Sequence, residues 1–242
     1  YWGTDLAAPV IEALSNELRS DPELSDRIHL TVAPADRLGE IPAGHFDVVV
    51  INSVIQYFPS VRYLADVIES AARHLRPGGA LFIGDVRNRL LLDTFHTAIA
   101  LSRSAAEGTD AEQVRRAAER GVELEKELLL EPDFFVALAH RLGLTAEIRL
   151  KTGAFHNELT RHRYDVILRA GTPVAPANRP VLHWPGDLEA VKAALTEAGS
   201  DGLRVTAIPN GRLAGEIAAT AHLAAGDIAV QLARGSIQLV AE

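Results

Sequence analysis

Four polar side chains follow directly on the most apolar stretch of the chain. Residues 48–51 read Val-Val-Val-Ile, a β-branched run that predicts a central strand buried on both faces of a parallel sheet. Asn52 and Ser53 come next, and Gln56 and Tyr57 follow. Open α/β sheets bind ligands outside the carboxyl ends of their strands, so we expect these amide and hydroxyl groups to border a ligand pocket. The alternative is that Asn52 and Ser53 only turn the chain and that Tyr57 and Phe58 are core aromatics.

Carboxylates stand at the ends of other predicted strands. Asp5, Asp36 and Asp85 each follow an apolar segment, and each carboxylate could accept hydrogen bonds from a ligand. Simpler roles are open for all three. Asp5 could cap the helix that follows it, and Asp36 could be a surface turn residue. Asp85 could pair with Arg87 as part of the scaffold.

Apolar periodicity, proline and glycine predict the elements that position these side chains. A strand followed by a helix is the unit of a parallel sheet, and this alternation predicts an α/β fold. We expect an antiparallel pair at 146–150 and 164–168 to close the sheet. One predicted helix begins at residue 8. The others lie at 61–75, at 91–130 in two pieces, and at 132–142, 187–198 and 212–224. The other predicted strands lie at 1–4, 28–32, 46–51, 80–84, 182–184, 203–208 and 228–240.

Three prolines within residues 172–180 predict a linker, because proline continues neither a helix nor the interior of a sheet. The expected organisation is therefore a core at 1–171, the linker, and a small α/β C-terminal subdomain at 181–242. The two helical pieces predicted within 91–130 carry many charged residues, which indicate a face exposed to solvent.

Composition excludes several classes of function. The formal net charge of −8 and the pI of about 5.6 argue against a nucleic-acid partner, because phosphate contacts need clustered Lys and Arg. No apolar run is long enough to span a bilayer and no signal peptide opens the chain, so we expect a cytoplasmic protein with no membrane partner. Without cysteine the chain has no disulfide, thiolate nucleophile or Cys-built zinc site, and we expect no metal.

Three stretches also resemble a known family. Residues 52–59 read Asn-Ser-Val-Ile-Gln-Tyr-Phe-Pro and are followed by a helix and then Leu-Arg-Pro-Gly-Gly at 75–79. Residues 157–165 read Asn-Glu-Leu-Thr-Arg-His-Arg-Tyr-Asp, and 208–216 is a third, weaker match. The chain resembles, over roughly 1–225, the methyltransferase domains embedded in nonribosomal peptide synthetases. This resemblance implies a class I methyltransferase fold with a Rossmann-like sheet and S-adenosylmethionine as cofactor.

The resemblance also implies roles for individual residues. It assigns Asp5 to the ribose hydroxyls of the cofactor, because a carboxylate matches a vicinal diol, and it places Leu6 beside it. It puts Asp36 near the adenine, and Asn52 and Ser53 at the methionine end of the cofactor.

On the acceptor side the resemblance implies Gln56, Tyr57 and Glu158. The substrate would be an aminoacyl phosphopantetheine thioester on a carrier protein, and flanking domains such as an adenylation domain would be further partners. Methyl transfer to the amine is an in-line displacement that depends mainly on alignment. An α-amino group of pKa about 7.7–8.0 is already partly neutral at pH 7, so a weak acceptor suffices to orient it and take its proton.

One departure from the family leaves alternatives open. The first strand and its Gly-rich loop, which hold the cofactor in the family, have no counterpart, so we expect them upstream of Tyr1 or lost. Their absence is the main support for a non-catalytic scaffold domain. Methylation of O, S or C is a further alternative, and a C-methyltransferase would need a base such as His96, His156 or His162.

Overall fold

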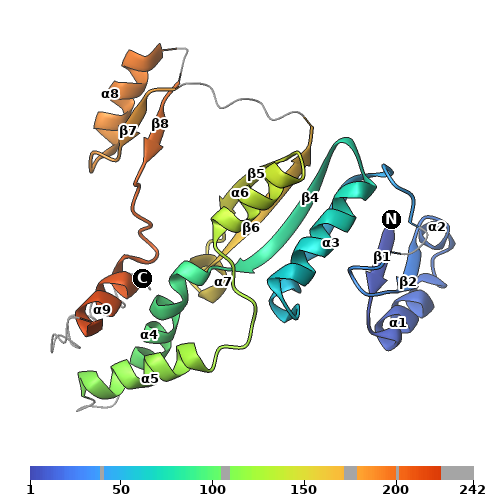
Figure 1. The fold of residues 1–242 in the computed structure, drawn as a ribbon, viewed down its shortest axis with the longest axis horizontal. Helices are drawn as coiled ribbons and strands as arrows, with labels where there is room; N and C mark the ends of the chain where they lie inside the picture. Colours follow the sequence, from blue (N-terminus) through green and yellow to red (C-terminus); the bar gives the residue numbers. More distant parts are fainter. Residues whose placement is uncertain (39–40, 105–109, 172–178, 200–201, 225–242) are drawn as a thin grey trace. The chain divides into compact units, whose positions relative to one another are not determined.

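The computed structural model describes residues 1–38, 41–104, 110–171, 179–199 and 202–224 (Figure 1). The contacts within the chain divide it into two units. The first unit comprises Tyr1–Asn88, Glu127–Leu150 and Arg163–Thr172. The second comprises Arg89–Lys126, Lys151–His162 and Pro173–Glu242. Each unit is described by itself. None of the described helices is both long and apolar enough to cross a membrane.

The first unit begins with a small parallel sheet. Its elements are β1 (Trp2–Asp5), α1 (Ala8–Leu18), α2 (Pro22–Ser25) and β2 (His29–Val32). β1 and β2 pair in parallel, with Trp2 opposite His29 and Asp5 opposite Val32. This confirms the strand, helix, strand order predicted for the start of the chain, which is the unit of a parallel sheet.

A second sheet of four strands forms the centre of the first unit. Its strands are β3 (Phe46–Asn52), β4 (Leu75–Arg87), β5 (Leu144–Leu150) and β6 (Arg163–Ala170), in the spatial order β3-β4-β6-β5. β3 and β4 are parallel, whereas β6 is antiparallel to both of its neighbours. The predicted closing pair is therefore confirmed, and the sheet is mixed.

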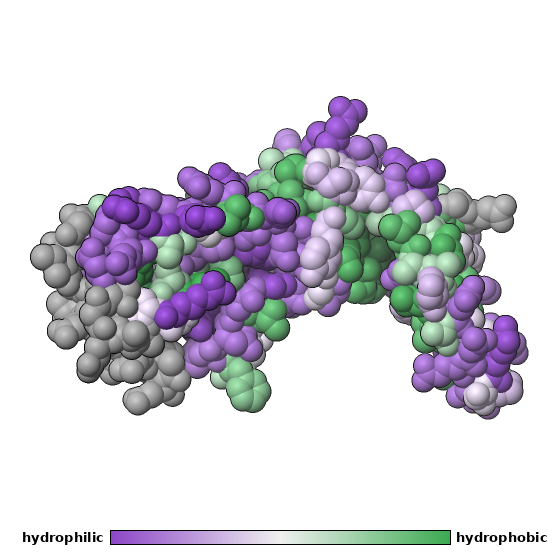
Figure 2. Space-filling view, turned by 90° about the horizontal axis from the view of Figure 1, so that it is seen from below, coloured by the Kyte–Doolittle hydropathy of each residue, from purple (hydrophilic) through white to green (hydrophobic). Residues whose placement is uncertain are grey.

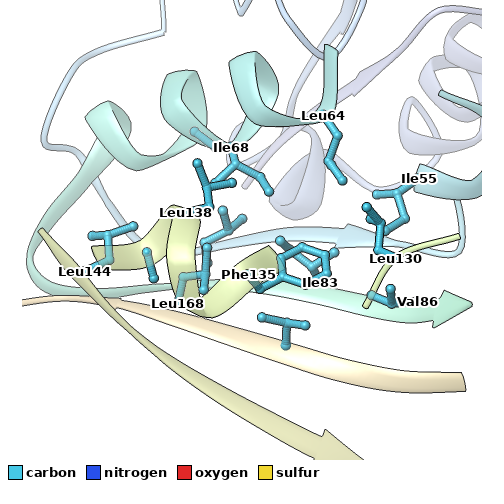
Figure 3. Packing of buried hydrophobic residues seen from close by; sticks show 14 of the residues in the cluster. Ile55, Leu64, Ile68, Ile83, Val86, Leu130, Phe135, Leu138, Leu144 and Leu168 are labelled. Atoms are coloured by element: carbon cyan, nitrogen blue, oxygen red, sulfur yellow. The ribbon is translucent and has the colours of Figure 1, made fainter. Parts of the chain in front are cut away.

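Helices α3 (Val61–His74) and α6 (Pro132–Arg141) pack on one face of this sheet (Figure 3). Ser60 begins α3, because its hydroxyl accepts a hydrogen bond from the backbone N–H of Tyr63 at 3.1 Å. The predicted apolar face of α3 is confirmed, since Leu64 and Ile68 are fully buried. They form one core with Ile55, Leu81, Ile83, Val86, Phe135, Leu138, Tyr164, Val166 and Leu168.

The structure corrects the prediction for β3. Val49 and Ile51 pack against the core, but Val48 and Val50 on the other face are 56% and 61% exposed. β3 is also an edge strand, because β1 and β2 form a sheet of their own instead of extending the one to which β3 belongs. Figure 2 shows that hydrophobic side chains lie on the surface beside strongly hydrophilic ones.

The segment that precedes the core of β4 also differs from its prediction. The sequence predicts a helix at 61–75 and a separate strand at 80–84, but α3 ends at His74 and β4 begins at Leu75, so Pro77-Gly78-Gly79 lies within the strand. Gly78 has φ of 80°, a conformation that other residues rarely adopt. The strand itself extends to Arg87, three residues beyond its predicted end at 84.

In the second unit three helices share an apolar core. α4 (Leu92–Arg103), α5 (Ala111–Glu123) and α9 (Ala214–Ala224) contribute Ala100, Leu101, Val114, Ala118, Ala219 and Leu223. The remaining elements are η2 (Arg89–Leu91), α7 (Glu158–Arg161), β7 (Val181–His183), α8 (Leu188–Ala198) and β8 (Arg204–Thr206), with β7 and β8 parallel. Residues 172–178 of the linker predicted at 172–180, and the whole of the predicted final strand at 228–240, lie outside the described residues.

Candidate functional site

The carboxyl ends of β3 and β4 meet at one edge of the four-stranded sheet. The two strands are parallel and in register as far as Asn52, which lies opposite Gly84. The 3₁₀ helix η1 (Ile55–Tyr57) follows β3 directly. The polar residues predicted after β3 therefore lie at a strand end, where open α/β sheets bind ligands.

A hydrogen-bonded network joins these strand ends. The Asn52 amide donates to Ser53 Oγ at 3.0 Å, and Ser53 Oγ donates to the Asp85 carboxylate on β4. The carboxylate of Asp165 on β6 accepts the backbone N–H of Asp85 at 3.0 Å. Ser53 therefore does more than turn the chain. Asp165 is the last residue of the family-like stretch 157–165, but no pattern along the chain indicated its contact with Asp85, which lies 80 residues away.

Gln56 is the most buried polar side chain among the residues predicted for the site, with 4% exposed. Its Nε2 donates to the backbone oxygen of Ser53 at 3.0 Å, and its backbone oxygen accepts from Leu128 N at 2.8 Å. Within the described part of the chain, its Oε1 is buried and has no hydrogen-bond partner. A buried acceptor of this kind carries a free-energy cost unless a bound molecule supplies the donor.

Tyr57 has a different environment. It is 71% exposed, so the alternative reading of Tyr57 as a core aromatic is wrong. Its neighbour Phe58 packs edge to face against Tyr63, with ring centroids 5.0 Å apart. The phenol of Tyr57 is accessible to a ligand that binds at the edge of the sheet.

The carboxylates predicted for the cofactor lie near the ends of β1 and β2, because Asp5 is the last residue of β1 and Asp36 follows β2. Asp5 is exposed, and its Oδ1 accepts the backbone N–H of Ala7 at 2.7 Å. Asp5 is not the N-cap of α1, because Ala7 occupies that position. Leu6 beside it is 73% exposed. Asp36 accepts a hydrogen bond from the Tyr63 hydroxyl at 3.0 Å, so it is tied to α3.

Burial and the hydrogen bond with Asp36 both change the pKa of the Tyr63 phenol. The pKa of Tyr63 is raised above its ordinary value, first because burial disfavours the phenolate and second because Asp36 accepts the phenol's hydrogen bond and carries a negative charge. The Tyr63 phenol therefore stays protonated and acts as a donor that fixes the Asp36 carboxylate.

The chain returns to the end of β4 at residues 127–130. The side chain of Arg87, 8% exposed, pairs with Glu127 at 2.8 Å, and Leu130 N donates to Arg87 O at 3.0 Å. The hydroxyl of Tyr164 donates to Leu130 O at 3.0 Å. The sequence analysis assigned no role to Glu127 or to Tyr164, although Tyr164 lies in the family-like stretch 157–165, because neither residue follows the end of a predicted buried strand.

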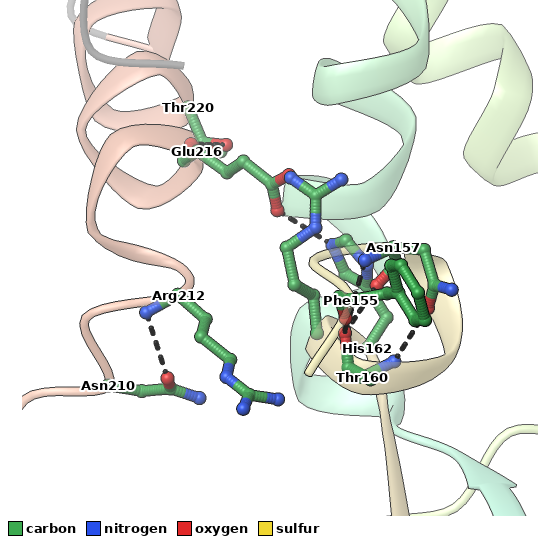
Figure 4. Close-up of polar contacts among 9 residues, drawn as sticks. Phe155, Asn157, Thr160, His162, Asn210, Arg212, Glu216 and Thr220 are labelled. Atoms are coloured by element: carbon green, nitrogen blue, oxygen red, sulfur yellow. Dashed lines mark hydrogen bonds and ion pairs between the residues drawn. The ribbon is translucent and has the colours of Figure 1, made fainter. Parts of the chain in front are cut away.

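The second unit holds Glu158 at the start of α7. Asn157 and Thr160 form a capping box around this helix, each side chain accepting a hydrogen bond from the other residue's backbone N–H. Behind it, Glu216 of α9 is almost fully buried and pairs with Arg161 at 2.5 Å and with His162 Nε2 at 2.9 Å (Figure 4). Glu158 is therefore the first residue of a helix that the capping box and the ion pairs of Glu216 hold in place.

Arg212 adds a second link between the same segments. Its guanidinium donates to the backbone oxygens of Lys151 and Gly153 at 3.0 and 2.9 Å. His96, another predicted base, lies 3.4 Å from Glu125. His96 and His162 therefore both have carboxylate partners inside the second unit. No cluster of His, Asp and Glu that could hold a metal ion is present among the described residues.

Comparison with known proteins decides the family. Residues 1–81 match a family model described as "Methyltransferase domain". The chain is 39% identical over 215 residues to the "Probable non-canonical nonribosomal peptide synthetase (NRPS) CymA" of Salinispora arenicola, covering 89% of this chain and 3% of that protein. It is 38% identical over 240 residues to "Chondramide synthase cmdD" of Chondromyces crocatus, covering 93% and 6%. The chain is a methyltransferase domain.

The methyltransferase domain spans a small fraction of the length of these curated relatives. A crystal structure of SAM-dependent methyltransferases from Methanosarcina mazei superimposes with a TM-score of 0.47 and 15% identity, over 71% of this chain and 82% of that one. The matched residues 1–81 of the methyltransferase domain contain β1, β2 and β3 with their polar ends. Glu158 lies outside that match and in the other unit, so its place beside Tyr57 stays a prediction.

Proposed function

We propose that this methyltransferase domain transfers a methyl group from S-adenosylmethionine to the α-amine of an aminoacyl thioester on a carrier protein, in nonribosomal peptide biosynthesis. The observation that carries the proposal is the buried Oε1 of Gln56 at the end of β3, which has no hydrogen-bond partner in the described part of the chain. An amine offers the N–H donor that this acceptor lacks.

The residues at the strand ends fit the cofactor. The Asp5 carboxylate accepts one hydrogen bond, from Ala7 N–H, and it has enough remaining lone pairs to accept hydrogen bonds from both hydroxyls of a ribose. Asp36, held by Tyr63, and the exposed Leu6 would border the base, and Asn52 and Ser53 would border the methionine end. When bound, the cofactor supplies an electrophilic methyl group on a sulfonium.

The chain's own contribution is alignment. Gln56 Oε1 accepts a hydrogen bond from the amine and orients its lone pair, while the backbone of Gln56 is held by Leu128 and its amide by Ser53. Such orientation can account for much of the rate of a two-reactant displacement. An α-amine is partly neutral near pH 7, so a weak acceptor suffices to take its proton. We assign the role of this proton acceptor to Tyr57 and Glu158.

The relatives indicate the setting of this reaction. Both similar proteins are named as peptide or chondramide synthases of which the chain covers a small part. We therefore propose that the substrate reaches the site on the phosphopantetheine arm of a carrier protein and that an adenylation domain is among the partners.

The deciding experiment supplies the protein with isotopically labelled S-adenosylmethionine and a carrier protein loaded with an amino acid. Mass spectrometry of the released aminoacyl group should locate one labelled methyl on nitrogen. A labelled methyl group found on oxygen, sulfur or carbon would contradict the α-amine as the acceptor. Cofactor binding without any methyl transfer would support a scaffold domain.

A further inference from the structure

Two residues at the candidate site have an unfavourable backbone conformation. Among the described residues, three that are not glycine have positive φ, namely Ser53 at 58°, Asp85 at 60° and Ala207 at 58°. Side chains other than that of glycine are disfavoured in this left-handed region, and such residues persist only where the surroundings hold them. Ser53 follows the end of β3, and Asp85 lies in β4 directly after Gly84, the last residue of that strand to pair with β3. The two residues contact each other.

The contacts that hold this pair come from three strands. Ser53 Oγ donates to the Asp85 carboxylate, and Ser53 N donates to Gly84 O at 3.2 Å. From the other side, the Asp165 carboxylate accepts the N–H of Asp85 at 3.0 Å. We refer to the hydrogen-bonded pair of Ser53 and Asp85 as the clasp. Asp85 lies where the pairing of β4 with β6 shifts in register, between Ile83 and Val86.

The clasp fixes the residues that face the ligand. Gln56 Nε2 donates to Ser53 O, and Asn52 Nδ2 donates to Ser53 Oγ, so both side chains are oriented by Ser53. Asn52 also lies across Gly84, where a Cβ atom would collide with the Asn52 amide oxygen. If Ser53 left the left-handed conformation, its backbone oxygen would move and the Gln56 amide would lose the partner that orients Oε1.

We propose that Asp85 is a positioning residue for methyl transfer: through Ser53 it holds the end of β3 so that Gln56 Oε1 points at the acceptor amine. This inference rests on the proposed function, because it takes the amine as the group that Gln56 orients. Asp85 itself needs to touch neither reactant.

Three variants separate the hydrogen bond of the clasp from its backbone strain and its charge. Asp85→Gly removes the bond and relieves the strain, so its melting temperature should stay near that of the wild type, since the two effects oppose each other. Asp85→Asn keeps an acceptor for Ser53 and tolerates the left-handed region, but has no charge. Ala207→Gly relieves the same strain in the second unit and serves as the matched control.

For each variant we would measure kcat and KM with a loaded carrier protein, cofactor affinity, and amide hydrogen exchange at residues 53–57. Asp85→Gly should lower kcat by about 10- to 100-fold, the cost of a misplaced reactant, with faster exchange at 53–57 and little change in cofactor affinity. Asp85→Asn should restore most of kcat, and Ala207→Gly should match the wild type.

Three outcomes overturn the proposal. Full kcat in Asp85→Gly would show that the clasp positions nothing, and unchanged exchange at 53–57 would show that it does not hold the end of β3. A loss in Asp85→Gly that Asp85→Asn fails to restore would make the charge itself the active feature. Failure of the proposed function is distinct, because the wild-type protein would then methylate no amine while the exchange experiment would still report on the clasp.

Discussion

Gln56 is the residue on which the candidate site depends most directly. Its side chain is buried and donates to Ser53 O, but its Oε1 has no partner among the described residues. Burying an unpaired acceptor costs free energy, so a function that supplies the donor explains why a glutamine occupies this place. An apolar residue of similar size would otherwise stabilise the fold equally well.

Gln56→Met keeps the volume but removes the acceptor. We expect kcat/KM for methylation to fall about tenfold, equivalent to one net hydrogen bond of about 1.4 kcal/mol. Steady-state kinetics with a loaded carrier protein measures it. Gln113→Met on α5, where the glutamine is exposed, is the control and should leave kcat/KM unchanged. Equal kinetics for both variants would remove Gln56 from the mechanism.

Asp5→Ala tests the cofactor side. The affinity for S-adenosylmethionine should weaken by about 1.5–3 kcal/mol, the range for a lost hydrogen bond to a charged group. Isothermal calorimetry gives the dissociation constant directly. Asp21→Ala is a suitable control, because Asp21 also accepts a backbone N–H near a helix start. Unchanged affinity in Asp5→Ala would contradict the assignment of Asp5 to the ribose.

Tyr164 gives a prediction about pH. Burial, and secondly the charge of Glu131, raise the pKa of its phenol above the ordinary 10.0. Since the folded pKa is the higher one, the stabilisation is complete below pH 10 and is lost as the pH rises through the folded value, by about 1.4 kcal/mol per pH unit. Urea unfolding between pH 8 and 11 should show a steeper loss for the wild type than for Tyr164→Phe, and parallel curves would contradict this.

At the scale of elements, α9 is fastened to the segment that carries Glu158. Ala219 and Leu223 share the apolar core of α4 and α5, while Arg212 and Glu216 bind both ends of the segment 151–162. The sequence predicted α9 as a helix of a small C-terminal subdomain, and its apolar spacing gave no indication of which element it packs against. The packing shows that residues near 216 brace residues near 160.

Glu216→Ala should therefore destabilise the protein by up to about 3–5 kcal/mol, because it leaves the partly buried guanidinium of Arg161 without its carboxylate. Chemical denaturation followed by circular dichroism measures this change. Glu189→Ala breaks an exposed pair with Lys192 and should cost about 1 kcal/mol or less. Similar losses for the two variants would show that burial of Glu216 contributes nothing.

At the scale of the whole molecule, the proposed acceptor residues come from both units. Tyr57 belongs to the first and Glu158 to the second. Tyr57→Phe and Glu158→Gln should each lower kcat for methylation with little change in cofactor affinity, the signature of interactions made with the substrate or in the transition state. Kinetics and calorimetry on the same preparations separate the two effects. Full-rate methylation by either variant excludes that residue.

The expected upstream strand stays a prediction at this scale. β1 and β3 belong to different sheets, and together they line a cavity of about 290 Å³ with residues that include Trp2, Thr4, Val48 and Val50. A strand paired to the open edge of β3 would cover Val48 and Val50 only if a further layer packed on that face.

The sequence by itself determined the local elements and the polar strand ends. Runs such as 48–51, the helical spacing of Leu64 and Ile68, and the paired strands near 146 and 164 are encoded in neighbouring residues, and they predicted correctly that β3, β5 and β6 are strands and α3 a helix. The prediction that β3 is central and buried on both faces was wrong, because burial depends on which elements pack beside the strand. Tertiary structure decided which distant residues meet. Asp85 contacts Ser53 from 32 positions away and Glu216 contacts Arg161 from 55, because such contacts depend on how strands and helices pack and not on any periodicity.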